Sequence, residues 1–474
     1  MMIRKKELFS KLVDLVKKTL LLLEKEISDA YYIAPFKTYP EISYENGQFP
    51  RLTYHSMKPD ISEFFRRKNA NFTPKIDLEV DELFQELVKI LISIPEFYKY
   101  YKDTVSENDT ILYIHSENFI KDIIIGYYYL HEYDFRIDRL EAIYWPLENF
   151  IYAETLNFDL AVPILFTVFE CDHFALTENM LIRRIDEDTH KAKFSIKSFS
   201  PAIADPLIYS ATHELVLKNY TSPKQPTFYQ YDAFGHPQIY PHDKIERFFS
   251  VLKLATDITS GYSQVIVHPF QWANQVRYDL KHLKGTSVRQ YPNNFDDFYW
   301  KKENFPVVTE EDLNLLRLLL NSVASNPENK LEIALKRFYK SMMRQAEEDI
   351  IIDIIIALEM LLGDNEKSEL THKLALRITT LITCESKEII DPMVIFNNVK
   401  KIYDYRSAVV HGSHKADQKR EIKTEDQKTI PVVMLANDYL RQILKILILS
   451  PKYLSSKEID KMMLVNQQHN LGLF

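Results

Sequence analysis

Glycine is scarce in this chain, and the scarcity excludes several large classes of fold and function. Only 8 of the 474 residues are glycine, about a quarter of the ~7% that is usual. None of them falls in the spacings GxGxxG, GxxxxGK[ST] or GxSxG. Loops that cradle phosphate need glycine so that the backbone can approach the ligand. The sequence therefore argues against a dinucleotide-binding domain, a P-loop nucleotidase and an α/β-hydrolase.

The net charge of −8 argues against nucleic-acid binding over a broad face, so any such contact must be local. The 29 Tyr and 28 Phe fit an aromatic core and surface, with stacking platforms for bases as the alternative. Cys171 and Cys384 make neither a zinc pattern nor a disulfide framework, which fits a reducing cytoplasm. Cys171–Asp172–His173 has no second cluster of ligands beside it. We therefore expect a cytoplasmic protein with no metal and no cofactor.

No segment has the pattern of a membrane anchor. Residues 5–28 have apolar side chains at helical spacing and predict an amphipathic helix rather than a signal peptide. The most apolar run, Ile350–Leu362, is too short to span a bilayer and carries Asp353 and Glu359. We expect no membrane partner.

The hydrophobic pattern predicts an α+β N-terminal module with a β-rich portion, followed by an all-α helical bundle. In the first part, residues 30–75 predict loops and short strands. The expected helices are 5–28, 77–94 and 242–256, and the expected strands are 160–170, 193–199 and 263–268. Proline and asparagine gather in 284–308, so we divide the chain into 1–308, with a subdivision near 135, and 309–474.

The second part is expected to be almost entirely helical. Thr309 followed by acidic residues predicts a helix N-terminus. Helices are expected at about 309–324, 328–344, 347–362, 367–384, 392–411 and 425–449.

The segment Tyr403–Gly412 reads YDYRSAVVHG and holds the strongest functional candidates. On a helix, Arg406 and His411 lie about 140° apart, so they do not share a face. Ser407 and His411 do share one, and Asp404 lies two turns before the histidine. Gly412 can adopt the left-handed conformation that closes a helix. The spacing alone also fits an ion-paired arginine and a histidine that favours the helix dipole.

Three segments of the second part carry a family resemblance. IIALEMLLG (355–363) contains Glu359, KLALRITTL (373–381) contains Arg377, and KIYDYRSAVVHGS (401–413) holds an arginine followed by a histidine. Together they resemble the HEPN domain (higher eukaryotes and prokaryotes nucleotide-binding), most closely its ApeA-like branch, over about residues 313–449. Ser407 stands where many members have Asn, Asp or His.

The resemblance implies a helical bundle that forms a homodimer and acts as a metal-independent endoribonuclease in toxin or anti-phage defence. The substrate would be RNA, with tRNA as one candidate, and attack by the 2′-OH would leave a cyclic phosphate. Arg406 would hold the phosphate and His411 would transfer a proton, with Ser407 and Asp404 in support. These roles suit the chemistry of a guanidinium and an imidazole. Because the two side chains face apart, a site would be composed where two copies meet.

Several residues and segments have more than one possible role. Glu359 and Arg377 lie in apolar helix patterns, where a charge needs a partner; Glu359 would orient Arg377 or Arg406, or act directly in catalysis. His414 and Lys415 are candidates for RNA binding, or they belong to a solvated loop. Some HEPN domains only bind nucleotides or partners, so a non-catalytic module is the alternative function. Residues 1–308 are candidates for sensing a phage-derived trigger or for restraining the nuclease.

Overall fold

The computed structural model describes sixteen stretches of the chain: residues 3–33, 35–37, 41–43, 51–53, 57–65, 75–102, 110–193, 196, 203–225, 234–273, 283–298, 305–364, 369–385, 391–414, 416–423 and 428–470. They divide into two compact units, each assembled from separated segments. The first unit contains Met1–Pro163, Ile182–Tyr240 and Ser263–Arg289, and the second contains Ile164–Leu181, Pro241–Tyr262 and Gln290–Phe474. That residues 1–308 and 309–474 have separate roles stays a prediction.

The first unit begins with a cluster of helices. Their bounds are α1 Lys6–Ser28, α2 Glu82–Ser93, α3 Pro95–Tyr101, α4 Thr110–His131 and α5 Ile137–Tyr152. Leu8, Leu12, Leu15 and Leu23 of α1 are buried in this cluster, which is why the apolar stripe predicted for 5–28 forms a helix. The N-terminus of α1 is capped from α5: the Glu148 carboxylate accepts the backbone N–H groups of residues 4 and 5, each at 2.8 Å.

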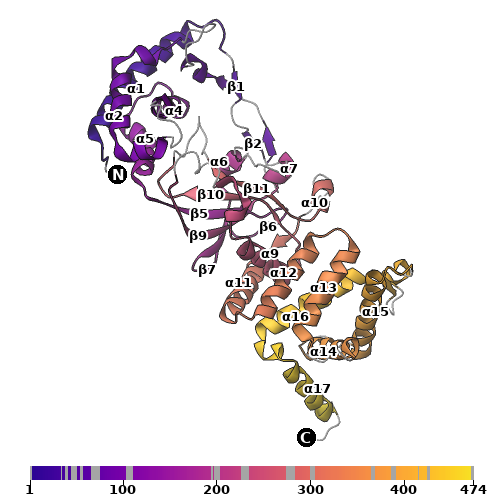
Figure 1. Cartoon of the computed structure of the whole chain (residues 1–474). Coiled ribbons are helices and arrows are strands. Elements are labelled where there is room, and N and C mark those ends of the chain that lie inside the picture. Colours follow the sequence, from indigo (N-terminus) through magenta and orange to yellow (C-terminus); the bar gives the residue numbers. More distant parts are fainter. Residues whose placement is uncertain are drawn as a thin grey trace. The chain divides into compact units, whose positions relative to one another are not determined.

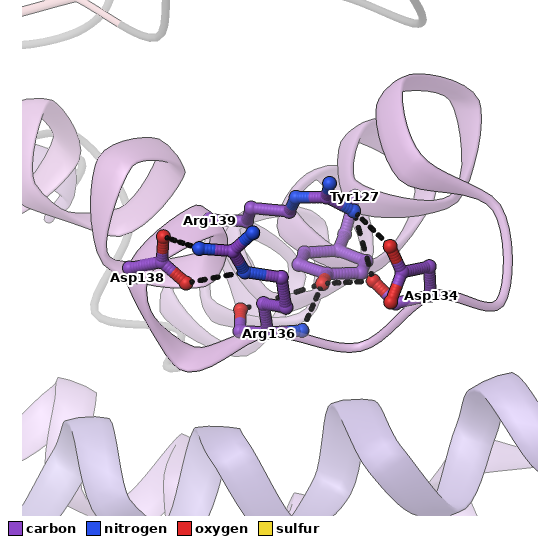
Figure 2. A network of polar contacts seen from close by, with 5 residues as sticks. All are labelled: Tyr127, Asp134, Arg136, Asp138 and Arg139. Carbon is purple, nitrogen blue, oxygen red and sulfur yellow. Dashed lines mark hydrogen bonds and ion pairs between the residues drawn. The ribbon is translucent and has the colours of Figure 1, made fainter.

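A polar network holds the turn between α4 and α5 (Figure 2). The Tyr127 hydroxyl donates to the backbone oxygen of Asp134 at 2.9 Å and accepts the N–H of Arg136 at 2.7 Å. Arg136 pairs with Asp138 at 2.8 Å and Arg139 with Asp134 at 2.7 Å. Burial raises the pKa of Tyr127 above its ordinary value, so the hydroxyl stays protonated as a donor. Each charged side chain in the network has a partner within the network, so the network stabilises the turn.

Four very short strands follow α1 in the chain. They form two antiparallel pairs, β1 Pro35–Lys37 with β4 Met57–Pro59 and β2 Glu41–Ser43 with β3 Arg51–Thr53. Single turns of 3-10 helix lie at Ile61–Phe65, Leu78–Val80 and Pro237–Ile239. The loops and short strands predicted for 30–75 agree with these described residues.

The β-rich part of the first unit is built around β5, Thr155–Pro163. Its strands follow the order β11-β10-β5-β9-β8. The other bounds are β8 Met180–Arg184, β9 His213–Pro223, β10 Tyr262–Pro269 and β11 Lys284–Gln290. β5 pairs antiparallel with both β9 and β10. Two short helices, α6 Glu187–Ala192 and α7 Asp205–Tyr209, belong to the same unit.

The second unit is a helical assembly with a few short strands (Figure 1, orange and yellow for its C-terminal part). Its helices are α9 His242–Thr256, α10 Asn294–Phe298, α11 Glu310–Ser325, α12 Asn329–Met343, α13 Glu347–Leu362, α14 Leu370–Glu385, α15 Pro392–Val410, α16 Val432–Leu449 and α17 Ser456–Asn470. Single turns of 3-10 helix lie at Asp417–Lys419 and Pro451–Leu454. Its strands are β6 Val168–Phe169, β7 His173–Thr177, β12 Val307–Val308, β13 Glu421–Lys423 and β14 Thr429–Pro431. Thr309 caps α11 through a capping box with Asp312, as the sequence predicted.

The predicted layout, a mixed N-terminal region followed by a helical C-terminal region, is confirmed. Three elements differ. Helix 425–449 begins only at Val432, because the residues before it form the hairpin β13–β14 and end in Pro431. Strand 160–170 is interrupted after Pro163. In the strand expected at 193–199, the described residues Lys193 and Ile196 are not in a strand, and the others lie outside the described residues.

The helix α17 was not predicted. None of the helices in the described part of the chain is both long and apolar enough to cross a membrane.

Candidate functional site

The candidate site is built on α15. Asp391 caps its start by accepting the N–H of Met393 at 2.8 Å, and Pro392 occupies the first helical position, where no amide donor is needed. Its buried side chains face the helices α13, α14 and α16; they are Ile395, Val399, Ile402, Tyr403, Tyr405 and Ala408. This packing fixes which residues of the motif remain accessible.

The end of α15 is closed by a Schellman motif. Gly412 has φ +60°, the left-handed conformation that the sequence predicted for it. Its N–H donates to the oxygen of Val409 at 3.1 Å, and the N–H of Ser413 donates to the oxygen of Ala408 at 2.9 Å. The N–H of His411 donates to the oxygen of Ser407 at 3.1 Å. The motif therefore fixes the backbone that carries the exposed His411 side chain.

The other supporting residues of the motif lie on the exposed side of α15. Asp404 and Ser407 are both exposed, like His411. The three positions follow each other at steps of three and four residues, which places them along one side of the helix. The backbone oxygen of Asp404 also accepts a bond of 3.5 Å from Lys419. The structure thus brings these three predicted residues together as an exposed stripe.

Arg406 lies apart from that stripe. It is half-buried, and its Nε is buried without a hydrogen-bond partner among the described residues. Tyr403, one turn earlier, is buried; burial first, and the nearby Glu359 carboxylate second, raise its pKa, while Arg406 acts in the opposite direction. Arg406, Tyr403 and Glu359 are therefore electrostatic neighbours. The phenol stays protonated and can donate a hydrogen bond.

Tyr403 is the member of this group that sequence reasoning missed. It fits the apolar pattern of α15, which by itself indicates only helix packing. Its position three residues before Arg406 was a usable signal, since such pairs are neighbours on a helix. What the pattern cannot show is the approach of Glu359 from α13.

The helix α13, which carries Glu359, is fixed near its middle and at its end. Near the middle, the buried Asp353 accepts bonds from Arg337 of α12, at 2.7 Å, and from Arg344 at the end of α12. At its end, Arg377 of α14 donates to the oxygen of Leu362 at 2.7 Å. These contacts set the position from which Glu359 faces α15.

Arg377, one of the two partners predicted for Glu359, binds other acidic residues. It donates to both carboxylate oxygens of Asp460 in α17 at 2.8 Å, and to Asp364 at 3.0 Å. The hydrogen bond to Asp460 is the main reason that its pKa is raised. With its donors engaged in this way, Arg377 holds α13, α14 and α17 together. Glu359 and Arg406 both act on Tyr403, and an orienting role of Glu359 toward Arg406 stays a prediction.

The residues after the motif are only partly described. His414 is exposed, and Lys415 lies outside the described residues. Arg420, farther along, pairs with Glu347 at the start of α13 at 2.9 Å. One of the basic side chains of this segment is therefore engaged within the fold. Among the residues that the structure describes, no group of three or more His, Cys, Asp or Glu side chains is placed to hold a metal ion.

Changing Gly412 to alanine tests the closure of α15. Space is no obstacle, because no atom lies within 4 Å of an added Cβ. Alanine adopts the left-handed backbone conformation less readily than glycine, so we expect the free energy of unfolding to fall by about 1 kcal/mol. Urea unfolding measures this, with Gly126→Ala in α4, also without near neighbours, as the control, which we expect to be neutral or stabilising. An equal effect of both changes would contradict the importance of the Schellman motif.

Comparison of this chain with protein-family models, with curated proteins and with solved structures finds no match in any of the three.

Proposed function

We propose that the second unit is a metal-independent HEPN-type endoribonuclease that cleaves RNA at a site made by Arg406 and His411. One observation carries the proposal: α15, closed at both ends, carries a half-buried arginine whose Nε has no hydrogen-bond partner among the described residues, and it ends at an exposed histidine. A structural arginine is normally paired, as Arg377 is in the same unit. In Arg406 the buried Nε has no partner among the described residues, so this donor is available to a ligand such as phosphate.

The chemistry requires few groups. The 2′-OH of RNA attacks the adjacent phosphorus, the 5′-oxygen leaves, and a cyclic phosphate forms. His411 moves a proton in this step, and Arg406 stabilises the charge that develops on the phosphate oxygens. Tyr403 and Glu359 act on Arg406 as positioning residues, because a buried phenol and a carboxylate restrict where the guanidinium can lie.

The site is composed from two copies of the chain in this proposal. Arg406 and His411 lie on different sides of α15, so one copy does not bring them onto one face. Exposed apolar side chains on the same helices support an interface: Met393 is 58% and Val410 is 49% exposed on α15, and Leu376 is 38% exposed on α14. An interface related by a two-fold axis would place Arg406 of one copy near His411 of the other.

The test uses purified full-length protein and a 5′-labelled RNA. Wild type is expected to cleave RNA in EDTA and to leave 2′,3′-cyclic phosphate ends, but not to cleave the same sequence as DNA. Arg406→Ala should lose about a hundredfold or more in rate, and Arg406→Lys should recover only part of it, because lysine lacks the bidentate fork. Full activity of Arg406→Ala would contradict the proposal. Expression in cells should be toxic for wild type and not for the variant.

The second candidate is a non-catalytic module that binds RNA or a second copy through the same helices. The exposed apolar side chains of α14 and α15 favour it as well, since they serve an interface in either case. RNA binding without cleavage, unchanged in Arg406→Ala, would identify this function.

A further inference from the structure

A buried polar cluster lies on one face of the sheet in the first unit, far in sequence from α15. Its members are Lys193, Glu214 and Gln264, which are 0%, 1% and 0% exposed. In each of them one polar atom is buried without a hydrogen-bond partner among the described residues: Nζ, Oε2 and Oε1, respectively. Such orphaned groups are expensive, and a native fold holds few of them.

The strand register places two of the three side chains around one point. Glu214 of β9 is opposite Pro163 of β5, and Ala161 of β5 is opposite Ile266 of β10. Continuing the second register puts Gln264 beside Pro163 on its other side. Because side chains alternate along a strand, Glu214 and Gln264 project from the same face, with backbones about 10 Å apart.

Lys193 lies at the same face of the sheet. It directly follows α6, and its backbone oxygen accepts a bond of 3.0 Å from Gln264 Nε2. The neighbouring Ala192 packs with Ala161 and Ile266 on the same face. The Glu214 carboxylate acts electrostatically on the Lys193 amine, yet no hydrogen bond or ion pair joins these two described residues.

The charged groups around the cluster leave one carboxylate oxygen and one amine available. Arg183 binds Oε1 of Glu214 at 2.7 Å, which leaves Oε2 to accept a further donor. Burial lowers the pKa of Lys193 to about 7, partly offset by Glu214. Burial also lowers the pKa of His190 to about 2, so this neighbour is neutral. The cluster thus offers one amine donor beside two acceptors, and an apolar wall made of Ala161, Ala192, Ile196, Ile266 and Leu283.

We propose that Lys193, Glu214 and Gln264 form a binding site for a small zwitterion with the chemistry of a neutral α-amino acid. Its carboxylate binds the Lys193 amine, and its ammonium donates to Glu214 Oε2 and Gln264 Oε1. Each orphaned atom thereby gains a complementary partner, and a ligand without net charge adds none to the interior. The apolar wall suits an aliphatic side chain. The site is independent of the proposed ribonuclease.

Titration calorimetry on the full chain tests the proposal with glycine, L-alanine, L-serine, L-valine and L-leucine as probes at millimolar concentration. At least one should bind with one-to-one stoichiometry. Analogues of the bound amino acid that lack the amine or the carboxylate should bind at least about tenfold more weakly, because buried groups then stay unpaired. For L-alanine these analogues are propionate and ethylamine. No binding by all five, or equal binding by an analogue, would overturn the proposal.

Two variants assign the binding to this cluster. Lys193→Met removes the amine but keeps the shape; it should fold, with an equal or higher melting temperature, and bind about tenfold or more weakly. Glu214→Gln should also weaken binding about tenfold and provides a second test if Lys193→Met does not fold. The control is Lys191→Met in α6, whose amine pairs with Glu187 at 3.0 Å, and it should keep wild-type affinity. Undiminished binding in folded Lys193→Met, or in Glu214→Gln, would contradict the assignment.

Discussion

Replacing His411 by alanine is expected to reduce RNA cleavage by about a thousandfold, the range of general acid–base catalysis. Stability should change little, since the side chain is exposed and only the backbone takes part in the closure of α15. Initial rates on a labelled RNA measure the first expectation, and thermal unfolding measures the second. The control is His173→Ala, an exposed histidine of β7, which should cleave at the wild-type rate. Equal cleavage by His411→Ala and wild type would remove the histidine from the mechanism.

The same variant shows whether the site is composed from two copies. His411→Ala retains Arg406, and Arg406→Ala retains His411. If one residue from each copy builds a site, a mixed dimer of the two inactive variants contains one complete site and one without either group. Mixing them under conditions that allow exchange should therefore restore activity. If both residues act within one copy, mixing does not restore activity. The two-copy model of the site would then be wrong, but the assignment of both residues to catalysis would not be affected.

Replacing Asp353 by alanine is expected to cause the largest loss of stability in the second unit. Asp353 is 1% exposed and binds the guanidinium groups of both Arg337 and Arg344. Its loss leaves two arginines without their shared buried partner and opens a space between α12 and α13. The two arginine side chains are 34% and 39% exposed, so the expected cost is near the lower end of the ~3–5 kcal/mol of a fully buried pair. A loss of about 3 kcal/mol lowers the melting temperature of a unit this size by roughly 10 °C.

Calorimetry on the full chain measures this shift. The matched control is Asp349→Ala on the same helix: Asp349 also pairs with Arg344, at 3.1 Å, but its side chain is 54% exposed. It should lower the melting temperature by no more than about 2 °C, as expected for a surface ion pair. Similar shifts for the two variants would contradict the role assigned to burial. Because α13 carries Glu359, Asp353→Ala should also slow cleavage at temperatures where the protein remains folded.

Several features of the site follow from the sequence alone. Local periodicity predicts α15, glycine predicts its end at Gly412, and helix geometry places Arg406 and His411 on different sides. The structure confirms the helix and its closure. These features depend on residues within a few turns of each other, so local propensity and spacing are sufficient to predict them.

Other features depend on contacts that no local pattern contains. Arg377 finds Asp460, 83 residues away, in a helix that was not predicted. Glu359 approaches Tyr403 and Arg406 from another helix, and strand register gathers Glu214 and Gln264 beneath Lys193. A charged residue in an apolar pattern shows that a partner is needed, but which partner it finds depends on how distant segments pack. The sequence by itself thus determined α15, its closure and the faces of its polar residues, and only the tertiary structure decided which buried charges meet.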